Sequence, residues 1–138
     1  MGVHLNPYLH FDGEAADAVA FYADVFGATT DVMTFGQMGM EGPDAQKIMH
    51  GQLETEHGIT LMLSDLPPGS TRERGNDVTL SLSGDDEPTL RGWYEQLSAS
   101  GTVGTPLEKQ MWGDLYGDCT DRFGVRWLVN ISAAEQRS

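Results

Sequence analysis

The chain contains 138 residues, and its 8 basic and 21 acidic side chains give a formal net charge of −13 at pH 7. Nucleic-acid affinity comes largely from Lys and Arg, and anionic lipid repels a strongly acidic protein, so this charge argues against both partners. No apolar run approaches the roughly 18 residues needed to span a bilayer. With a single cysteine, Cys119, and no signal-like opening segment, we expect a cytoplasmic globular protein without an internal disulfide.

The first half of the chain predicts a strand, a helix and three further strands. Apolar residues alternate over residues 3–11, which is the period of a strand. Helical spacing of apolar residues follows over 15–26, and Gly27 offers a stop. Residues 36–44 hold three glycines and a proline and are predicted to form a loop. The three further strands are expected at residues 29–35, 48–56 and 59–64.

The second half predicts the same order of elements again. A strand is expected over residues 77–83, and the segment 85–88 begins a helix with a proline in its first turn. Leu90, Trp93, Tyr94 and Leu97 form the buried stripe of this helix. The strands that follow are expected at residues 102–105, 107–111, 115–120 and 125–131.

Matching residues indicate an internal duplication. Phe21-Tyr22 stands 93 − 21 = 72 positions before Trp93-Tyr94, and His50-Gly51 stands 116 − 50 = 66 positions before Tyr116-Gly117. The six-residue difference corresponds to the longer glycine-rich loop of the first half. We therefore predict a single α+β domain of two tandem βαβββ modules, whose curved sheets surround a central cleft. The predicted boundaries are 1–65 for the first module, 66–76 for a connector, 77–132 for the second module and 133–138 for a tail.

Several motifs resemble a known family. They are Asn6-Pro7-Tyr8-Leu9, Phe26-Gly27-Ala28, Leu61-Met62-Leu63-Ser64-Asp65, Trp112-Gly113 and Asp121-Arg122-Phe123-Gly124-Val125-Arg126-Trp127. Together they resemble the PhnB-like branch of the vicinal oxygen chelate superfamily, which includes glyoxalases, bleomycin-resistance proteins and dioxygenases. The resemblance implies a glyoxalase-like fold, a small-molecule ligand and a homodimer.

The same resemblance implies a metal site that this sequence does not reproduce. Metal-using members bind a divalent ion with His and Glu residues from four strands. Carried over by the motifs, those positions fall near Pro7, Leu61, Val78 and Leu128, and none of these residues is a ligand. The usual metal site is therefore expected to be absent or rebuilt, and the cofactor is left unknown.

Candidate site residues come from the predicted strand over 48–56. His50, Gln52 and Glu54 share one of its faces, a pattern typical of a solvated sheet face. On the concave face of a barrel the same pattern would line a pocket. His50 and Glu54 would then hold a metal or act as an acid/base pair, with Tyr116 as a third catalytic candidate. The expected ligand-binding residues are Gln52, Met38, Met62, Trp112 and Asp118. His4 and His10 share a face with Asn6 and Tyr8 and are further candidates for this pocket.

Two functions remain open at this point. The first is an enzyme of the lyase or dioxygenase type with a non-standard site around His50, Glu54 and Tyr116. The second is a metal-free protein that sequesters a drug or metabolite, for which the net charge of −13 favours a cationic ligand.

Overall fold

The computed structural model describes residues 2–67 and 69–132. The chain divides into two compact units, Met1–Arg74 and Gly75–Ser138, and this boundary lies within the predicted connector 66–76. The predicted tail 133–138 lies outside the described residues. Across these residues, no helix combines the length and the apolar character needed to cross a membrane.

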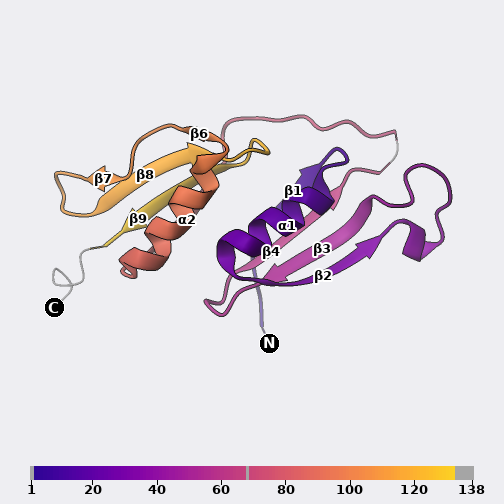
Figure 1. Ribbon diagram of the computed structural model, residues 1–138, viewed down its shortest axis with the longest axis horizontal. Helices are drawn as coiled ribbons and strands as arrows, with labels where there is room; N and C mark the ends of the chain where they lie inside the picture. The colour runs from indigo at the N-terminus through magenta and orange to yellow at the C-terminus, as the bar shows by residue number, and fades with distance from the viewer. Residues whose placement is uncertain (1, 68, 133–138) are drawn as a thin grey trace. The chain divides into compact units, whose positions relative to one another are not determined.

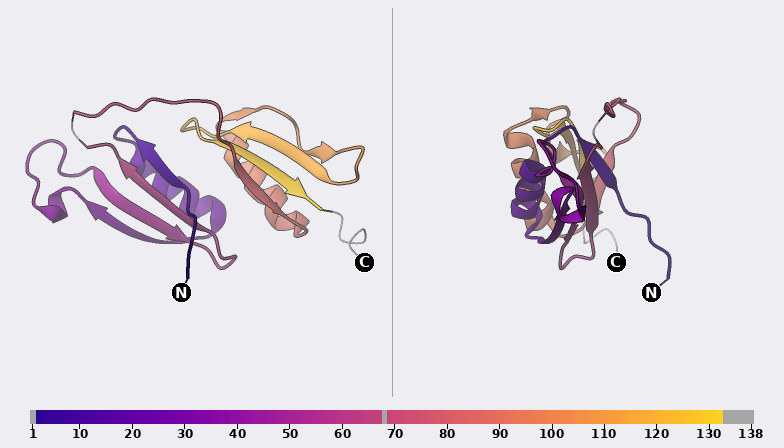
Figure 2. Two further views of the ribbon diagram at one scale, coloured as in Figure 1. Left: turned by 180° about the vertical axis from the view of Figure 1, so that it is seen from behind. Right: turned by 90° about the vertical axis from the view of Figure 1, so that its right-hand side faces the viewer.

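The first unit is a four-stranded sheet with one helix on one face (Figure 1). Its strands lie in the order β1-β4-β3-β2, in which β1 is parallel to β4 and the other neighbours are antiparallel. Seen from behind, the strands lie in front of the helix, so the opposite face of this sheet is turned toward the viewer (Figure 2). The elements are β1 (Tyr8–Phe11), α1 (Ala15–Phe26), β2 (Thr29–Thr34), the short 3-10 helix η1 (Gly36–Met38), β3 (Ile48–Glu54) and β4 (Thr60–Asp65).

The core of this unit lies between α1 and the sheet. The helix buries its apolar stripe, with Tyr22 fully buried, against Phe11 and Leu63, which are also fully buried. Gly51 permits this close approach, since a Cβ there would lie 3.0 Å from the Leu63 side chain and 3.3 Å from that of Val19. The helix ends at Gly27 in the left-handed conformation (φ 64°), as the sequence predicts.

A buried carboxylate begins the helix. The N-cap residue Glu14 makes no side-chain cap, and Asp65 at the end of β4 takes that role. Its Oδ1 accepts hydrogen bonds from the backbone N–H groups of Gly13 (2.7 Å) and Ala15 (3.0 Å), and its Oδ2 accepts one from Ile48 (2.9 Å). Asp65 thus joins three segments and satisfies donors that a helix start leaves open.

The second unit repeats this arrangement. The sheet order is β5-β9-β8-β6, and β7 pairs with the same strand, β8, as β6 does. Its helix again lies on one face of the sheet (Figure 1). The elements are β5 (Leu80–Gly84), α2 (Glu87–Ala99), β6 (Thr102–Val103), β7 (Glu108–Lys109), β8 (Leu115–Thr120) and β9 (Arg126–Ile131).

Two aspartates organise this unit as well. Asp86 caps α2 by accepting a hydrogen bond from the backbone N–H of Thr89, and a proline follows in the first turn, as predicted. Asp121 is 3 % exposed and holds the β8–β9 turn. It accepts hydrogen bonds from the backbone N–H groups of Phe123 (2.9 Å) and Val125 (3.1 Å) and from Nε1 of Trp127 (2.9 Å).

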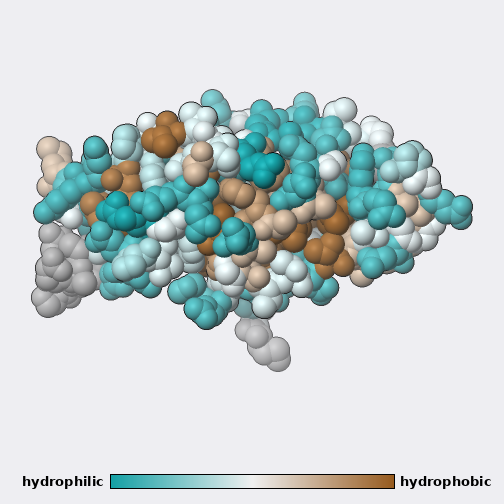
Figure 3. Space-filling model, viewed as in Figure 1, coloured by the Kyte–Doolittle hydropathy of each residue, from teal (hydrophilic) through white to brown (hydrophobic). Residues whose placement is uncertain are grey.

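The predicted fold class is confirmed, while several strand boundaries differ from the predictions. Both units have the order strand, helix, strands, in an α+β fold whose sheets do not close into a barrel. The predicted strand over 3–11 begins at Tyr8, directly after Pro7, whose nitrogen carries no hydrogen to donate to the partner strand β4. The strand predicted over 77–83 corresponds to β5, which begins at Leu80 and ends at Gly84. On the side shown in Figure 3, hydrophilic residues cover much of the surface and hydrophobic residues lie among them.

Candidate functional site

The face of the first sheet opposite α1, called the open face below, carries most of the polar side chains predicted for the site. Side chains alternate along a strand, and Phe11, Leu53 and Leu63 point toward the helix. Their chain neighbours therefore share the open face. The pairing of Gly51 with Leu63 also places His50 beside Ser64. Two rows of residues cross this face: His10, Ser64, His50 and Met33 in one, and Tyr8, Met62, Gln52 and Asp31 in the next.

Four of these residues form a connected group, called the His–Tyr cluster below: Tyr8, His10, His50 and Ser64. His10 Nδ1 lies 3.2 Å from Ser64 Oγ, and the ring of His10 stacks on that of Tyr8 with 4.9 Å between centroids. The Tyr8 hydroxyl reaches to 3.3 Å from His50 Nδ1, and these two rings meet edge to face at 5.8 Å. Ser64 is 6 % exposed and Tyr8 is 44 % exposed, so the cluster runs from the interior to the surface.

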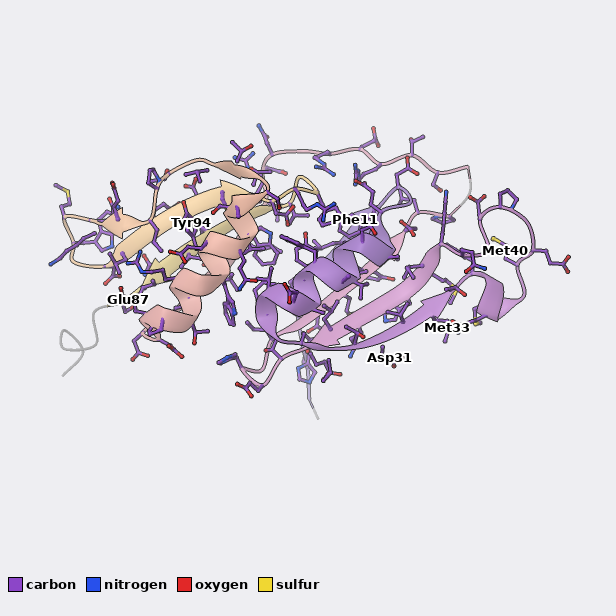
Figure 4. All side chains as sticks on the ribbon, viewed as in Figure 1. Phe11, Asp31, Met33, Met40, Glu87 and Tyr94 are labelled. Atoms are coloured by element: carbon purple, nitrogen blue, oxygen red, sulfur yellow. The ribbon has the colours of Figure 1, made fainter. Side chains whose placement is uncertain are left out.

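Glu54 and Gln52 lie beyond the cluster on the same face. Gln52 Nε2 donates a hydrogen bond to Glu54 Oε2 at 3.2 Å. Asp31 is paired with Gln52 across the sheet, and Figure 4 labels it with Met33 on the edge strand β2. The carboxylates Asp31 and Glu54 therefore lie on β2 and β3, whereas the imidazoles lie on β1 (His10) and β3 (His50).

The donor groups do not fit the metal site that the family implies. His50 and Glu54 are four residues apart on one strand, so their Cα atoms are separated by about 13 Å, too far to share one ion. In the described part of the chain, no group of three or more His, Cys, Asp or Glu side chains is arranged to hold a metal ion. The carried-over positions near Pro7, Leu61, Val78 and Leu128 offer no ligand either.

The corresponding face of the second unit uses its polar groups to hold its own backbone. The Tyr116 hydroxyl donates to Asp118 Oδ2 at 3.1 Å, and Asp118 Oδ1 accepts a hydrogen bond from the backbone N–H of Thr105 at 2.8 Å. The Tyr94 hydroxyl donates to the Thr105 carbonyl at 2.9 Å. These bonds secure the break between β6 and β7, where the sequence predicts two longer strands. Burial, and then the hydrogen bond to Asp118, raise the pKa of Tyr116.

The two units therefore differ in what their polar faces do. In the described residues, the hydrogen bonds of the His–Tyr cluster connect its side chains only to each other, and none of them holds the backbone. A set of imidazole and phenol groups that supports no turn or strand edge is a candidate for ligand contact. The Asp118 carboxylate, by contrast, holds the backbone N–H of Thr105.

The sequence predicts His10, which shares a strand face with Tyr8, only as a further candidate for the pocket, and it does not predict Ser64 as a site residue. The signal for Tyr8 and His10 was the alternation of the first predicted strand. Ser64 joins them only through the pairing of β1 with β4, strands far apart in the chain, and no local pattern shows that pairing.

The other predicted site residues lie in separate places. Met62 lies on the open face beside Tyr8. Met38 belongs to η1 and is 59 % exposed, and Trp112 is 57 % exposed in the turn between β7 and β8. Cys119 is buried, and burial together with Asp121 and Asp118 raises its pKa to about 11, which suits a structural thiol better than a nucleophile.

Comparison with known proteins assigns the family. The model of the Glyoxalase/Bleomycin resistance protein/Dioxygenase superfamily matches residues 4–129. Protein YjdN of Escherichia coli is 31 % identical over 142 residues, covering 92 % of this chain and 94 % of that protein. The crystal structure of PA1353 from Pseudomonas aeruginosa is 32 % identical with a TM-score of 0.85, covering 96 % of this chain and 99 % of that one.

A PhnB protein from Bacillus cereus shares the fold at 17 % identity, with a TM-score of 0.75 over 94 % of this chain and all of that one. This likeness concerns the fold. The chain belongs to the Glyoxalase/Bleomycin resistance protein/Dioxygenase superfamily.

Proposed function

We propose that this protein binds a small organic molecule on the open face of its first unit and that His50 makes the principal polar contact with it. The observation that carries the proposal is the His–Tyr cluster, in which Tyr8 and His10 orient His50 while no cluster hydrogen bond supports the backbone. Small-molecule sites combine apolar surface with a few oriented polar groups. Met62 and Met33 supply adaptable apolar surface beside the cluster.

The chemistry that this arrangement supports best is proton transfer, of the kind a lyase uses. An imidazole within hydrogen-bond distance of a phenol can exchange a proton with a bound molecule, which is general acid/base chemistry. Glu54 and Tyr116 remain proposed participants. Glu54 lies two rows along the open face from the level of His50, and Tyr116 belongs to the second unit.

A metal-free sequestering protein is the second candidate. Asp31 and Glu54 place carboxylates on the open face, and its two rows contain no Lys or Arg. Together with the net charge of −13, they favour a cationic ligand. Such a protein would bind its ligand without turnover. We further propose a homodimer in the cytoplasm, as the family resemblance and the composition suggest.

A ligand screen by NMR on isotope-labelled protein tests the proposal. Fragments that bind should shift the backbone signals of the residues around His50 on β3 and β4. His50→Gln should weaken binding roughly tenfold, the cost of about one charge-assisted or buried hydrogen bond. The matched control is His57→Gln, at the exposed turn between β3 and β4, which should leave binding unchanged.

Two results would count against the proposal. If no fragment shifts signals on this face, the face is a solvated surface. If His50→Gln and His57→Gln weaken binding equally, His50 is not the principal contact. Native mass spectrometry of the same protein, purified without metal resin, reports the number of subunits and any bound ion or ligand. A bare dimer after metal is added back would favour the sequestering candidate.

A further inference from the structure

We infer that Ser64 and His10 are positioning residues that hold Tyr8 so that its hydroxyl fixes His50 in the tautomer protonated at Nε2, and that the ligand of the open face offers an acceptor oxygen. This inference rests on the proposed function, because it concerns the same site. It adds two roles and a ligand class that the family comparison does not assign.

Ser64 forms the buried end of the cluster. Ser64 is 6 % exposed on β4, and its hydroxyl lies 3.2 Å from His10 Nδ1. A buried hydroxyl that loses its partner costs free energy, so this bond restrains the ring of His10. His10 is next to Ser64 in the register of the parallel pair, and the backbone of the sheet therefore holds both groups. The hydrogen bond to Ser64 therefore fixes the orientation of the His10 ring.

The restrained ring then positions Tyr8. The two rings are stacked at 4.9 Å with an interplanar angle of 27°, so the ring of His10 limits the rotation of the phenol. The Tyr8 side chain is 44 % exposed and would otherwise sample several orientations in water. Held against His10, its hydroxyl lies 3.3 Å from His50 Nδ1.

This contact selects one protonation pattern of His50. A neutral imidazole has one donor and one acceptor nitrogen, and the partner of one nitrogen decides where the proton resides. A phenol donates more strongly than it accepts, so Nδ1 is the acceptor and Nε2 carries the proton. Among the described residues, Nε2 of His50 has no hydrogen-bond partner. The cluster therefore offers an N–H donor to a bound molecule.

The donor defines the chemical class of the ligand. An imidazole N–H is satisfied by a carbonyl or carboxylate oxygen. Met62, adjacent to Tyr8, adds apolar contact for the rest of such a molecule. We therefore expect a small carbonyl or carboxylate compound that carries an apolar group.

Side-chain ¹⁵N NMR of the histidines tests the positioning roles without a ligand. In the unmodified protein, His50 should show one tautomer, with an acceptor-type Nδ1 and a donor-type Nε2. Tyr8→Phe keeps the ring stack and removes the hydroxyl, so His50 should shift to a mixture of tautomers. Ser64→Ala should shift His50 in the same direction, because the Ser64 hydroxyl is bonded to His10 and acts on His50 through the His10 and Tyr8 rings. Thr60→Ala, on β4 outside the cluster, is the control.

A second variant distinguishes the loss of the Ser64–His10 hydrogen bond from a general disturbance of the fold by Ser64→Ala. His10→Phe keeps an aromatic ring against Tyr8 but cannot bond Ser64, and it should shift His50 as Ser64→Ala does. The double variant Ser64→Ala/His10→Phe should shift the ¹⁵N signals of His50 no further than either single variant, because both substitutions remove the same hydrogen bond between Ser64 and His10. An unchanged His50 spectrum in both single variants, with native backbone signals, would overturn the positioning roles.

Benzoate and benzylammonium test the ligand class. Both carry one phenyl ring, and the net charge of −13 favours the amine. Stronger binding of benzoate, with the largest shift at His50 Nε2 and a roughly fivefold loss in Ser64→Ala, is the expected result. Stronger binding of benzylammonium would overturn the ligand class and support the cation-sequestering function. If neither probe shifts this face while the tautomer results hold, the positioning roles stand and the proposed function fails.

Discussion

Replacing Asp65 tests how the first unit is held together. Its carboxylate is 2 % exposed and accepts three backbone hydrogen bonds, from Gly13, Ala15 and Ile48. Asp65→Ala leaves three N–H groups without their acceptor, and each orphaned group costs about 1–3 kcal/mol. Since the turn at Gly13 can move toward water, we expect a loss of about 4 kcal/mol in the free energy of unfolding, within the range for breaking a buried polar set.

Asp65→Asn keeps the shape of the side chain and removes its negative charge. The amide keeps one acceptor oxygen but turns an NH₂ group toward a backbone donor, so we expect a loss of about 2 kcal/mol. Asp24→Asn, on the exposed side of α1, is the matched control and should change stability by less than about 0.5 kcal/mol. Urea unfolding should be followed by far-UV circular dichroism, because all three tryptophans lie in the second unit and report on it.

Hydrogen exchange gives the direct observation. The amides of Gly13, Ala15 and Ile48 should lose protection in Asp65→Ala before the central strand β3 does. If Asp65→Asn and Asp24→Asn have equal stability, or if these three amides keep their protection, the carboxylate does not organise the helix start as we argue.

Three further predictions concern the second unit. Asp121→Ala should cost about 3 kcal/mol and lower the urea midpoint seen by tryptophan fluorescence, because it frees the Trp127 indole N–H and two backbone donors; an unchanged midpoint would contradict it. Cys119, with its pKa raised to about 11, should be about 100-fold less thiolate than a free thiol at pH 8 and react correspondingly slowly with a disulfide reagent, the rate rising as pH increases toward 11; labelling at the rate of the unfolded chain would refute this. Met111 is 98 % exposed and should be oxidised by dilute peroxide before Met62, as peptide mass mapping would show.

The sequence predicts which face of a strand each residue occupies better than it predicts which strands lie side by side. Alternation placed His50, Gln52 and Glu54 together, and the structure has them on one face of β3. The duplication and the helix boundaries also follow from local patterns, because Gly27 and the 85–88 segment carry their own signals. Which strand lies beside β3 or β1 depends on contacts between distant residues, and periodicity does not encode that.

The candidate site shows the same limit. Ser64 and His10 meet because β1 pairs with β4, more than 50 residues later in the chain. Asp118 is predicted to bind a ligand because it is the second-repeat counterpart of the polar face that carries Gln52, and its carboxylate also holds the backbone N–H of Thr105 where the edge strand breaks. A polar residue on a sheet face can serve either purpose, and only the position of its partner distinguishes them.

The position of β1 at the edge of its sheet makes the assembly of the cluster a local equilibrium. β1 has four residues and one neighbouring strand, and the fully buried Phe11 anchors only its C-terminal end. Fraying from Tyr8 would remove the phenol and then His10 while His50 and Ser64 stay in place on inner strands. The imidazole of His50 therefore keeps its orientation only as long as β1 stays paired with β4. A ligand that contacts Tyr8 would tighten the strand and slow amide exchange at Leu9 and His10, so occupancy of the face could be followed through the backbone of one edge strand.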